Sequence, residues 1–311
     1  MRMGRRRVLS SVSNKGRQSR FVDTQRHMNL SLFLVDVDGQ ERFVNVLDTA
    51  ANGASGEGSA GQTPLMIIGG TAQTIDTYTG HLRELAGGKR RLIIPELRNQ
   101  GKTQLLSAHG HMAQHVDDVV ALLRALNVPT VDLCGFSFGG RVALAVASTH
   151  PEAVRRLSIT GVPLHREPLG SLILQSWGDG LNHGQLRACA WSFILNGYSE
   201  GFIARFADRL PSFVNQIVQD NECNKLADLM NLSHITADSN YYSVPSCASR
   251  VVCPTQVIAA SLDRIAAPAM VRALGDTIPG TIFVEVQGSG HLVPFEKPSE
   301  WRRNVLQFLD A

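Results

Sequence analysis

The chain has 311 residues, 43% of them hydrophobic and 18% charged, a balance typical of a globular protein, and no apolar run reaches the roughly 18 residues that a membrane-spanning helix needs. The net charge of +3 is unevenly distributed, because residues 1–28 hold eight Arg or Lys and one acid, which leaves −4 for the rest of the chain. These features exclude integral membrane association and give no support to a nucleic-acid partner.

The N-terminal stretch, residues 1–28, is rich in Arg and Ser, and its only acid is Asp23. Two interpretations fit this composition: a transit peptide, which would make the protein mitochondrial, or a disordered basic tail on a cytoplasmic protein. The stretch lacks the apolar segment of a secretory signal, so secretion is not expected. The cysteines are odd in number, scattered and without C-x-x-C spacing, which indicates free thiols in a reducing compartment and no zinc site. They are Cys134, Cys189, Cys223, Cys247 and Cys253.

Two partly alternating segments follow this stretch. Leu30–Val37 and Arg42–Leu47 flank the turn residues Asp38-Gly39-Gln40, and this pattern predicts an antiparallel hairpin. The next segment, Ala51–Thr63, has no apolar periodicity and is rich in Gly, Ser and Ala, so we expect a flexible inserted loop.

From Pro64 onward, short continuous apolar runs alternate with helix-like stretches. Such runs are typical of strands buried on both faces, and their alternation with helices predicts an α/β fold with a mostly parallel, doubly wound sheet. From residue 163 to residue 250 the pattern is helical, and strand patterns return afterwards. We therefore expect an α/β core formed by residues 29–162 and 251–311, with residues 163–250 inserted as a helical cap.

A candidate nucleophile follows one of these apolar runs. Gly135-Phe136-Ser137-Phe138-Gly139 matches G-x-S-x-G and lies between the strand pattern VDLC and the helix pattern RVALAVAS. In this context a sharp strand-to-helix turn presents the serine hydroxyl above the sheet, and Gly135 and Gly139 supply the small flanking residues that the turn requires. A glycine-rich turn with a capping serine is the alternative interpretation.

A serine hydroxyl needs a base within hydrogen-bond reach, and the base needs a third group to hold its tautomer. Asp263 directly follows the strand pattern TQVIAAS, which places its carboxylate at the carboxyl edge of the sheet. His291 lies in the loop GSGHLVPFEKP after the last strand pattern. We therefore predict Ser137 as nucleophile, His291 as general base and Asp263 as the acid that orients the histidine. A turn aspartate and a structural histidine are the alternatives for the last two residues.

The tetrahedral intermediate of such a reaction needs two backbone N–H donors, which form an oxyanion hole. Phe138, directly after the nucleophile, is the first candidate. Thr71 is the second, because paired glycines precede it after the first buried run and let the backbone fold in closely. A plain strand-ending glycine turn is the alternative for this loop.

Three histidines, His109, His111 and His115, have a spacing that metal ligands can show. No carboxylate cluster or partner motif accompanies them. We therefore expect a solvated segment at the entry to a helix, and no metal site.

With these residues located, the chain resembles the α/β-hydrolase superfamily over roughly residues 30–311, in its group with a helical cap above the site. The resemblance implies no cofactor, and members of the group include small-molecule esterases, enol-lactonases and carbon–carbon bond hydrolases. The chain departs from the common pattern at Gly69-Gly70, where the family commonly has His-Gly, and at Glu96, where it commonly has Asp. The segments that carry the resemblance are MIIGGTAQT, IIPELRNQGKT, CGFSFGGRVALAVASTHP, AASLDRIAAPAM and GSGHLVPFEKP.

The nucleophile and the resemblance together imply a serine hydrolase that cleaves a small ester, thioester, lactone or related carbonyl compound through an acyl-enzyme at Ser137. The expected partner is therefore a small-molecule acyl or carbonyl substrate. The unusual Gly69-Gly70 loop leaves a second hypothesis open, a non-catalytic protein of the same fold that binds a ligand or another protein.

Overall fold

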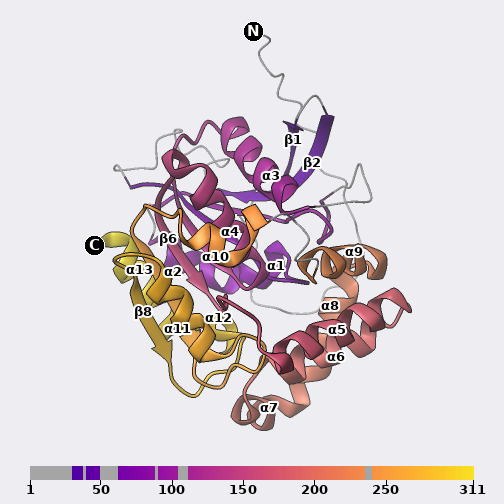
Figure 1. The fold of residues 1–311 in the computed structure, drawn as a ribbon. Helices are drawn as coiled ribbons and strands as arrows, with labels where there is room; N and C mark the ends of the chain where they lie inside the picture. The colour runs from indigo at the N-terminus through magenta and orange to yellow at the C-terminus, as the bar shows by residue number, and fades with distance from the viewer. Residues whose placement is uncertain (1–29, 38–39, 50–61, 88–89, 104–110, 235–239) are drawn as a thin grey trace.

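The computed structural model describes residues 30–37, 40–49, 62–87, 90–103, 111–234 and 240–311 (Figure 1). The predicted tail or transit peptide at residues 1–28, the turn residues Asp38-Gly39 and nearly all of the predicted loop at residues 51–63 lie outside these ranges. Among the described residues, no helix combines the length and the apolarity that crossing a membrane requires.

The described part of the chain contains an eight-stranded sheet with the strand order β1-β2-β4-β3-β5-β6-β7-β8. In this sheet β2 runs antiparallel to β1 and β4, and the other neighbouring strands pair in parallel. The prediction of a mostly parallel sheet is therefore confirmed. The strands are β1 (Leu30–Val37), β2 (Gln40–Asp48), β3 (Leu65–Ile68), β4 (Leu92–Pro95), β5 (Val131–Phe136), β6 (Val154–Thr160), β7 (Thr255–Ala260) and β8 (Ile282–Val286).

The first two strands form the predicted antiparallel hairpin. β1 has the predicted bounds, whereas β2 begins earlier, at Gln40, and ends at Asp48. Gln40, which we expected in the turn, pairs with Val37 in the ladder. Two residues are enough to connect antiparallel strands, so the ladder can extend this far toward the turn.

The central strands are buried on both faces because successive side chains of a strand point to opposite sides. In β3, Leu65 and Ile67 pack against one layer of helices, and Met66 and Ile68 pack against the other. This double burial explains why the strands are continuous apolar runs in the sequence. The first layer contains α1 (Ile75–Tyr78), α2 (Leu82–Ala86), α12 (Val293–Glu296) and α13 (Pro298–Asp310), and the second contains α3 (Met112–Ala125), α4 (Phe138–Thr149), α10 (Val244–Ala248) and α11 (Pro268–Thr277).

Between β6 and β7 the described residues form helices and no strand. Five of these helices gather at one end of the molecule (Figure 1), and α6 and α8 share a small apolar cluster. The helix α10, which also lies in the predicted cap range, packs on α4 of the core. The assignment of residues 163–250 as a cap stays a prediction. The five helices are α5 (Pro168–Asn182), α6 (Leu186–Gly197), α7 (Glu200–Phe206), α8 (Leu210–Asp220) and α9 (Cys223–His234), and short 3-10 turns occur at Thr79–His81, Pro151–Ala153, Ala207–Arg209 and Asn240–Tyr242.

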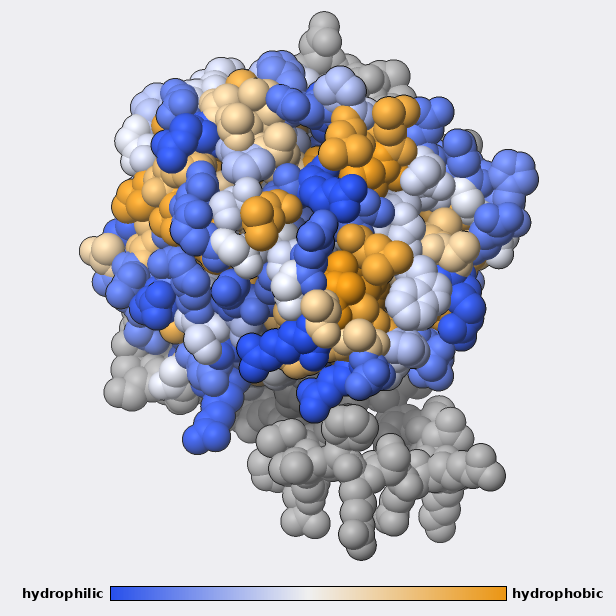
Figure 2. All heavy atoms as spheres, turned by 90° about the horizontal axis from the view of Figure 1, so that it is seen from below, coloured by the Kyte–Doolittle hydropathy of each residue, from blue (hydrophilic) through white to orange (hydrophobic). Residues whose placement is uncertain are grey.

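The surface seen from below mixes polar areas with separate apolar patches (Figure 2). Exposed large hydrophobic side chains include Leu169 and Leu172 of α5 and Leu195 of α6. A few exposed leucines are ordinary on the surface of a folded protein.

All five cysteines are free thiols, as the sequence predicts. Cys134 lies in β5, three residues before Ser137. Burial raises the pKa of its thiol to about 12. A thiol in this state is not a nucleophile at neutral pH, so Cys134 does not compete with the serine for that role.

Candidate active site

Ser137 lies at a sharp turn between the end of β5 and the start of α4. Its φ of 51° and ψ of −116° form a backbone conformation that costs free energy in any residue with a Cβ. The neighbouring strand holds it there, because the Ser137 N–H donates to the carbonyl of Thr160 in β6 at 2.8 Å. The turn therefore presents the hydroxyl at the carboxyl edge of the sheet.

Close backbone packing requires the two glycines that flank this serine. A Cβ on Gly135 would lie 2.6 Å from the carbonyl oxygen of Gly139. A Cβ on Gly139 would lie 2.3 Å from the carbonyl oxygens of Ile68 and Gly69. The end of β3 thus packs directly against the turn, which fixes the distance between the serine and the loop that follows β3.

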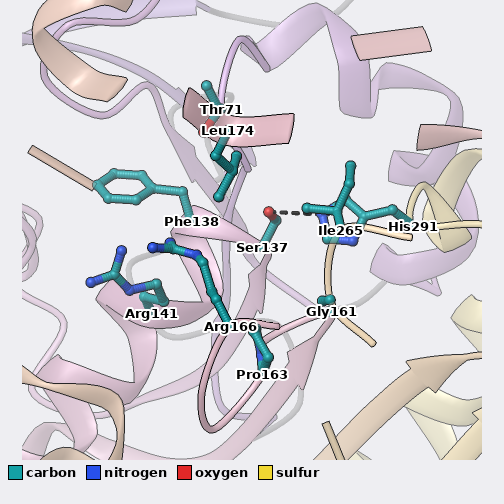
Figure 3. Close-up of a pocket in the computed structure, with 11 residues that line it drawn as sticks. Thr71, Ser137, Phe138, Arg141, Gly161, Pro163, Arg166, Leu174, Ile265 and His291 are labelled. Carbon is teal, nitrogen blue, oxygen red and sulfur yellow. Dashed lines mark hydrogen bonds between the residues drawn. The ribbon is translucent and has the colours of Figure 1, made fainter. Parts of the chain in front are cut away.

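Ser137, His291 and Asp263 form a hydrogen-bonded chain. His291 Nε2 lies 2.9 Å from Ser137 Oγ (Figure 3), and His291 Nδ1 lies 2.7 Å from Asp263 Oδ2. The serine follows β5, the aspartate β7 and the histidine β8, so the three meet at the carboxyl edge of the sheet. These are the three residues that the sequence predicts for nucleophile, acid and base, and the structure brings them together.

The surroundings of Asp263 determine which nitrogen of His291 carries the proton. Asp263 Oδ1 accepts the backbone N–H groups of Ile265 and Ala266, both at 2.8 Å, and Oδ2 faces His291. An ionised carboxylate only accepts, so the proton of the neutral ring lies on Nδ1. Nε2 then presents its lone pair to the Ser137 hydroxyl, which is what a general base requires.

The loop that carries His291 is held in place by Glu296, a residue that the sequence reasoning missed. The Glu296 carboxylate accepts the N–H of Gly290 at 3.0 Å and the N–H of Ser199 at 3.0 Å, and it also accepts the Ser199 hydroxyl. Ser199 precedes α7, so one carboxylate ties the histidine loop to the helices between β6 and β7. The available signal was the acid in GSGHLVPFEKP, a segment that carries the family resemblance.

Thr71 and Phe138 line the same pocket as Ser137. Phe138 is the first residue of α4, where backbone N–H groups have no partner within the helix. Gly70 packs against the nucleophile, since a Cβ on Gly70 would lie 3.2 Å from the Ser137 Cβ. The absence of a side chain at Gly70 therefore lets the loop approach the serine closely, and Thr71 is the next residue of this loop.

Glu96, the second departure from the family pattern, is buried. Its carboxylate accepts the N–H of Ile75 at 3.2 Å, the N–H of Lys102 at 2.7 Å and the side-chain amide of Asn45 at 2.8 Å. Glu96 thus joins the start of α1 to the loop after β4 and to β2, and its role is structural.

The pocket around Ser137 is small and opens to solvent. Arg141 on α4 and Arg166, between β6 and α5, lie next to each other on the side of Ser137 away from His291 (Figure 3). Burial, together with the charge of Arg141, lowers the pKa of Arg166 to about 9. The sequence reasoning missed both arginines. The lining residues are Thr71, Ser137, Phe138, Arg141, Gly161, Pro163, Arg166, Leu174, Ile265, Ala266 and His291.

The solvent exposure of the histidines before and within α3 differs from the prediction of a solvated segment. His111 is exposed, but His115 is only 1% exposed and packs edge-on against the Phe138 ring, with centroids 5.0 Å apart. Burial lowers the pKa of His115 to about 3, with a further contribution from Arg141. The prediction is wrong for His115 because this residue lies on the buried face of α3. His109 lies outside the described residues, and within the described part of the chain no cluster of His, Cys, Asp or Glu could hold a metal ion.

Comparison with known proteins agrees with this fold. A pyrrolizixenacetamide deacetylase from Xenorhabdus hominickii is 27% identical over 247 residues, which is 79% of this chain and 90% of the relative. A 2-hydroxymuconate semialdehyde hydrolase from Pseudomonas sp. (strain CF600) is 34% identical over 128 residues, 40% of this chain and 45% of the relative. The solved structure of an enol-lactonase from Burkholderia xenovorans LB400 has a TM-score of 0.74 at 18% identity, covering 88% of this chain and 98% of that chain. Residues 63–298 match the family model described as the alpha/beta hydrolase fold, so the protein belongs to the α/β-hydrolase family.

Proposed function

We propose that this protein is a serine hydrolase that cleaves a small ester, thioester, lactone or related carbonyl compound through an acyl-enzyme on Ser137. The observation that carries the proposal is the hydrogen-bonded chain from Ser137 through His291 to Asp263 at the pocket. Relatives named as a deacetylase and as a semialdehyde hydrolase support the hydrolysis of a carbonyl compound.

In the acylation step, Ser137 Oγ attacks the substrate carbonyl carbon while His291 Nε2 takes the hydroxyl proton. The negative charge that develops on the carbonyl oxygen is stabilised by the backbone N–H groups of Phe138 and Thr71. His291 then gives its proton to the leaving group as the tetrahedral intermediate collapses. The product of this step is an ester between the acyl group and Ser137.

In the deacylation step, water takes the place of the leaving group. His291 removes a proton from the water, which attacks the acyl-enzyme carbonyl, and Ser137 Oγ leaves with that proton. Asp263 stays ionised throughout and stabilises the imidazolium that forms twice in each turnover. The acid product then leaves and the serine hydroxyl is restored.

The helices between β6 and β7 act in this proposal as a cap that selects the substrate. Leu174 of α5 lines the pocket beside Ser137, and Pro163 lines it where the chain leaves β6. The cap is tied to the catalytic loop through Glu296 and Ser199. In this proposal, substrate selection therefore depends on residues 163–250.

A fluorophosphonate probe tests the proposal, because it reacts with serines that a neighbouring base activates. We expect the full-length protein to be labelled on the peptide that contains Ser137, as read by mass spectrometry. Ser137→Ala should abolish labelling, whereas Ser176→Ala, which removes an exposed serine of α5, should not. A folded parent protein that is labelled no more than Ser137→Ala would contradict the proposal and favour a protein that only binds a ligand.

A further inference from the structure

We propose that Asn221, which lies between α8 and α9, is a positioning residue for the oxyanion hole, because it holds the turn that carries the Thr71 N–H. The inference rests on the proposed function, in which this N–H stabilises the carbonyl oxygen of the substrate. Asn221 is not one of the described residues that line the Ser137 pocket, so it acts through the backbone of the turn and not on the substrate.

Thr71 belongs to a tight turn formed by residues 70–73. The Gln73 N–H donates to the Gly70 carbonyl at 3.2 Å and closes this turn. The third residue, Ala72, has a φ of 62°, in the left-handed region that turns usually fill with glycine or asparagine. An alanine in this conformation is strained, so contacts from outside the turn have to hold it there.

Two planar peptide units connect Asn221 to the Thr71 N–H. Asn221 Nδ2 donates to the Ala72 carbonyl at 3.2 Å. That carbonyl and the Gln73 N–H belong to one planar unit, so holding the oxygen also orients the N–H that closes the turn. The acceptor of this N–H is the Gly70 carbonyl, which shares its own planar unit with the Thr71 N–H. The direction of the Thr71 N–H therefore depends on the bond from Asn221.

The two ends of the turn are held by the core. Gln73 Oε1 accepts the Gly70 N–H at 2.7 Å and the hydroxyl of Tyr78, in α1, at 2.6 Å. Gln100, in the loop after β4, accepts the Gln73 N–H at 3.1 Å. The bond to the strained Ala72 comes instead from the helices between β6 and β7. These helices therefore contribute to the geometry of the oxyanion hole as well as to the pocket.

The Asn221 amide is buried, and its donor bonds define its orientation. Nδ2 donates to the Ala72 carbonyl and also to the Ile217 carbonyl of α8, at 3.0 Å. Turning the amide over would place Oδ1 against these two carbonyl oxygens, and none of these atoms can donate. Oδ1 itself has no hydrogen-bond partner in the described part of the chain. A buried polar atom without a partner is costly, so packing alone does not favour an asparagine here.

The first experiment replaces Asn221 by Leu, which keeps the size of the side chain and removes both donors. The rate of fluorophosphonate labelling at Ser137 and the kcat and KM for p-nitrophenyl acetate are measured on the full-length protein. Loss of an oxyanion donor costs about 10²- to 10³-fold in kcat, and a displaced donor should cost less, so we expect a loss of about 10-fold. KM should change by less than about 2-fold, because the negative charge exists only in the transition state. Labelling should slow together with kcat.

The second experiment separates this role from the bond that Asn221 makes to the end of α8. Glycine adopts a left-handed φ without strain, so Ala72→Gly added to Asn221→Leu should restore kcat by about 3-fold. Ala72→Gly alone should not raise kcat. A loss that came only from the helix end would not respond to this glycine. The matched control is Asn215→Leu, which removes an exposed asparagine of α8 that accepts from Arg187 and should keep the parental rates.

Asn221→Ser is the second variant if Asn221→Leu does not fold. Its side chain is too short to reach the Ala72 carbonyl, so the same loss of kcat and the same rescue are expected. If neither variant folds, the role of Asn221 is structural and the inference is wrong.

The other outcomes separate this inference from the proposed function. If the parent is labelled at Ser137 and the folded Asn221→Leu variant keeps the parental kcat, the positioning role is wrong and the serine hydrolase stands. The positioning role is equally wrong if kcat falls and Ala72→Gly restores none of it. If the folded parent is neither labelled nor active, the proposed function fails and the positioning role fails with it.

Discussion

Replacing Asp263 by Asn changes one oxygen of the carboxylate into an NH2 group, and the structure determines which one. Oδ1 accepts two backbone N–H groups, from Ile265 and Ala266. Turning the amide nitrogen toward them would bury two donors without acceptors, at a cost of about 1–3 kcal/mol each. The amide oxygen therefore occupies the Oδ1 position, and the NH2 group faces His291 Nδ1. That nitrogen must then accept, so the ring proton moves to Nε2 and points at Ser137.

A histidine in this tautomer cannot take the serine proton, and an amide cannot stabilise the imidazolium. In the serine proteases the equivalent change lowers kcat by about 10⁴-fold, or about 5 kcal/mol of transition-state stabilisation. Because the backbone contacts of Asp263 fix the amide in the unproductive orientation, we expect a loss of about 10³ to 10⁴ in kcat here. The free energy of unfolding should fall by at most about 1–2 kcal/mol, since the two N–H bonds to Oδ1 are kept.

The assay is kcat on an ester that the parent cleaves, measured together with a thermal melting curve. Asp276→Asn is the matched control, because Asp276 is exposed on α11 and far from the described catalytic contacts. It should have the parental kcat and the parental melting temperature. A folded Asp263→Asn variant with undiminished kcat would remove Asp263 from the mechanism, and a variant that fails to fold would make its role structural.

Three further predictions follow from contacts around the site. Gly139→Ala would place a Cβ 2.3 Å from the Ile68 carbonyl oxygen and should destabilise the fold by about 3 kcal/mol in urea unfolding; a change below about 1 kcal/mol would show that β3 can move away. Glu296→Gln, which weakens the acceptor for the Gly290 N–H, should lower kcat about 10-fold while the melting temperature falls by only a few degrees, and an unchanged kcat would refute its positioning role. His115 stays neutral when folded, so the unfolded chain binds an extra proton below about pH 6.5 and stability falls as the pH drops toward about 3. Between about pH 5.5 and about pH 4, we therefore expect the free energy of unfolding of the parent to fall by roughly 1 kcal/mol per pH unit more than that of His115→Phe, as measured by urea unfolding. The same pH dependence in parent and variant would contradict this.

The parts of the site that could be predicted from sequence are those that local geometry determines. A buried strand, a glycine-flanked serine and a helix follow one another within a few residues, so the turn at Ser137 could be predicted from residues 131–149 alone. The same holds for Asp263, which is in the turn directly after β7, and for the parallel sheet, whose strands are continuous apolar runs. Each of these inferences used the periodicity or the turn chemistry of one short segment.

The prediction that His115 is solvated was wrong, although the sequence contains a pattern that indicates its burial. Met112, His115, Val116 and Val119 have the spacing of one helix face, and all four are buried in α3. A histidine on that face is expected to be buried, whatever the polarity of the segment before it. The helix periodicity of the residues that follow His115 was therefore a better guide than the run of histidines that precedes it.

Arg141, Arg166 and Glu296 could not be found in this way, because their positions depend on contacts between distant segments. Ser137 and Arg141 lie one helical turn apart at the start of α4, so the distance between them is set by this helix alone. His291 instead reaches the serine on a loop whose position depends on Glu296 and on Ser199, 97 residues earlier in the chain. The strained turn at the serine lies within one strand-turn-helix unit and is held by Thr160 of the adjacent strand, whereas the histidine lies on a loop that Glu296 ties to Ser199. The serine is therefore positioned by the sheet and by α4, and the position of the histidine depends on how the helices between β6 and β7 pack against the sheet.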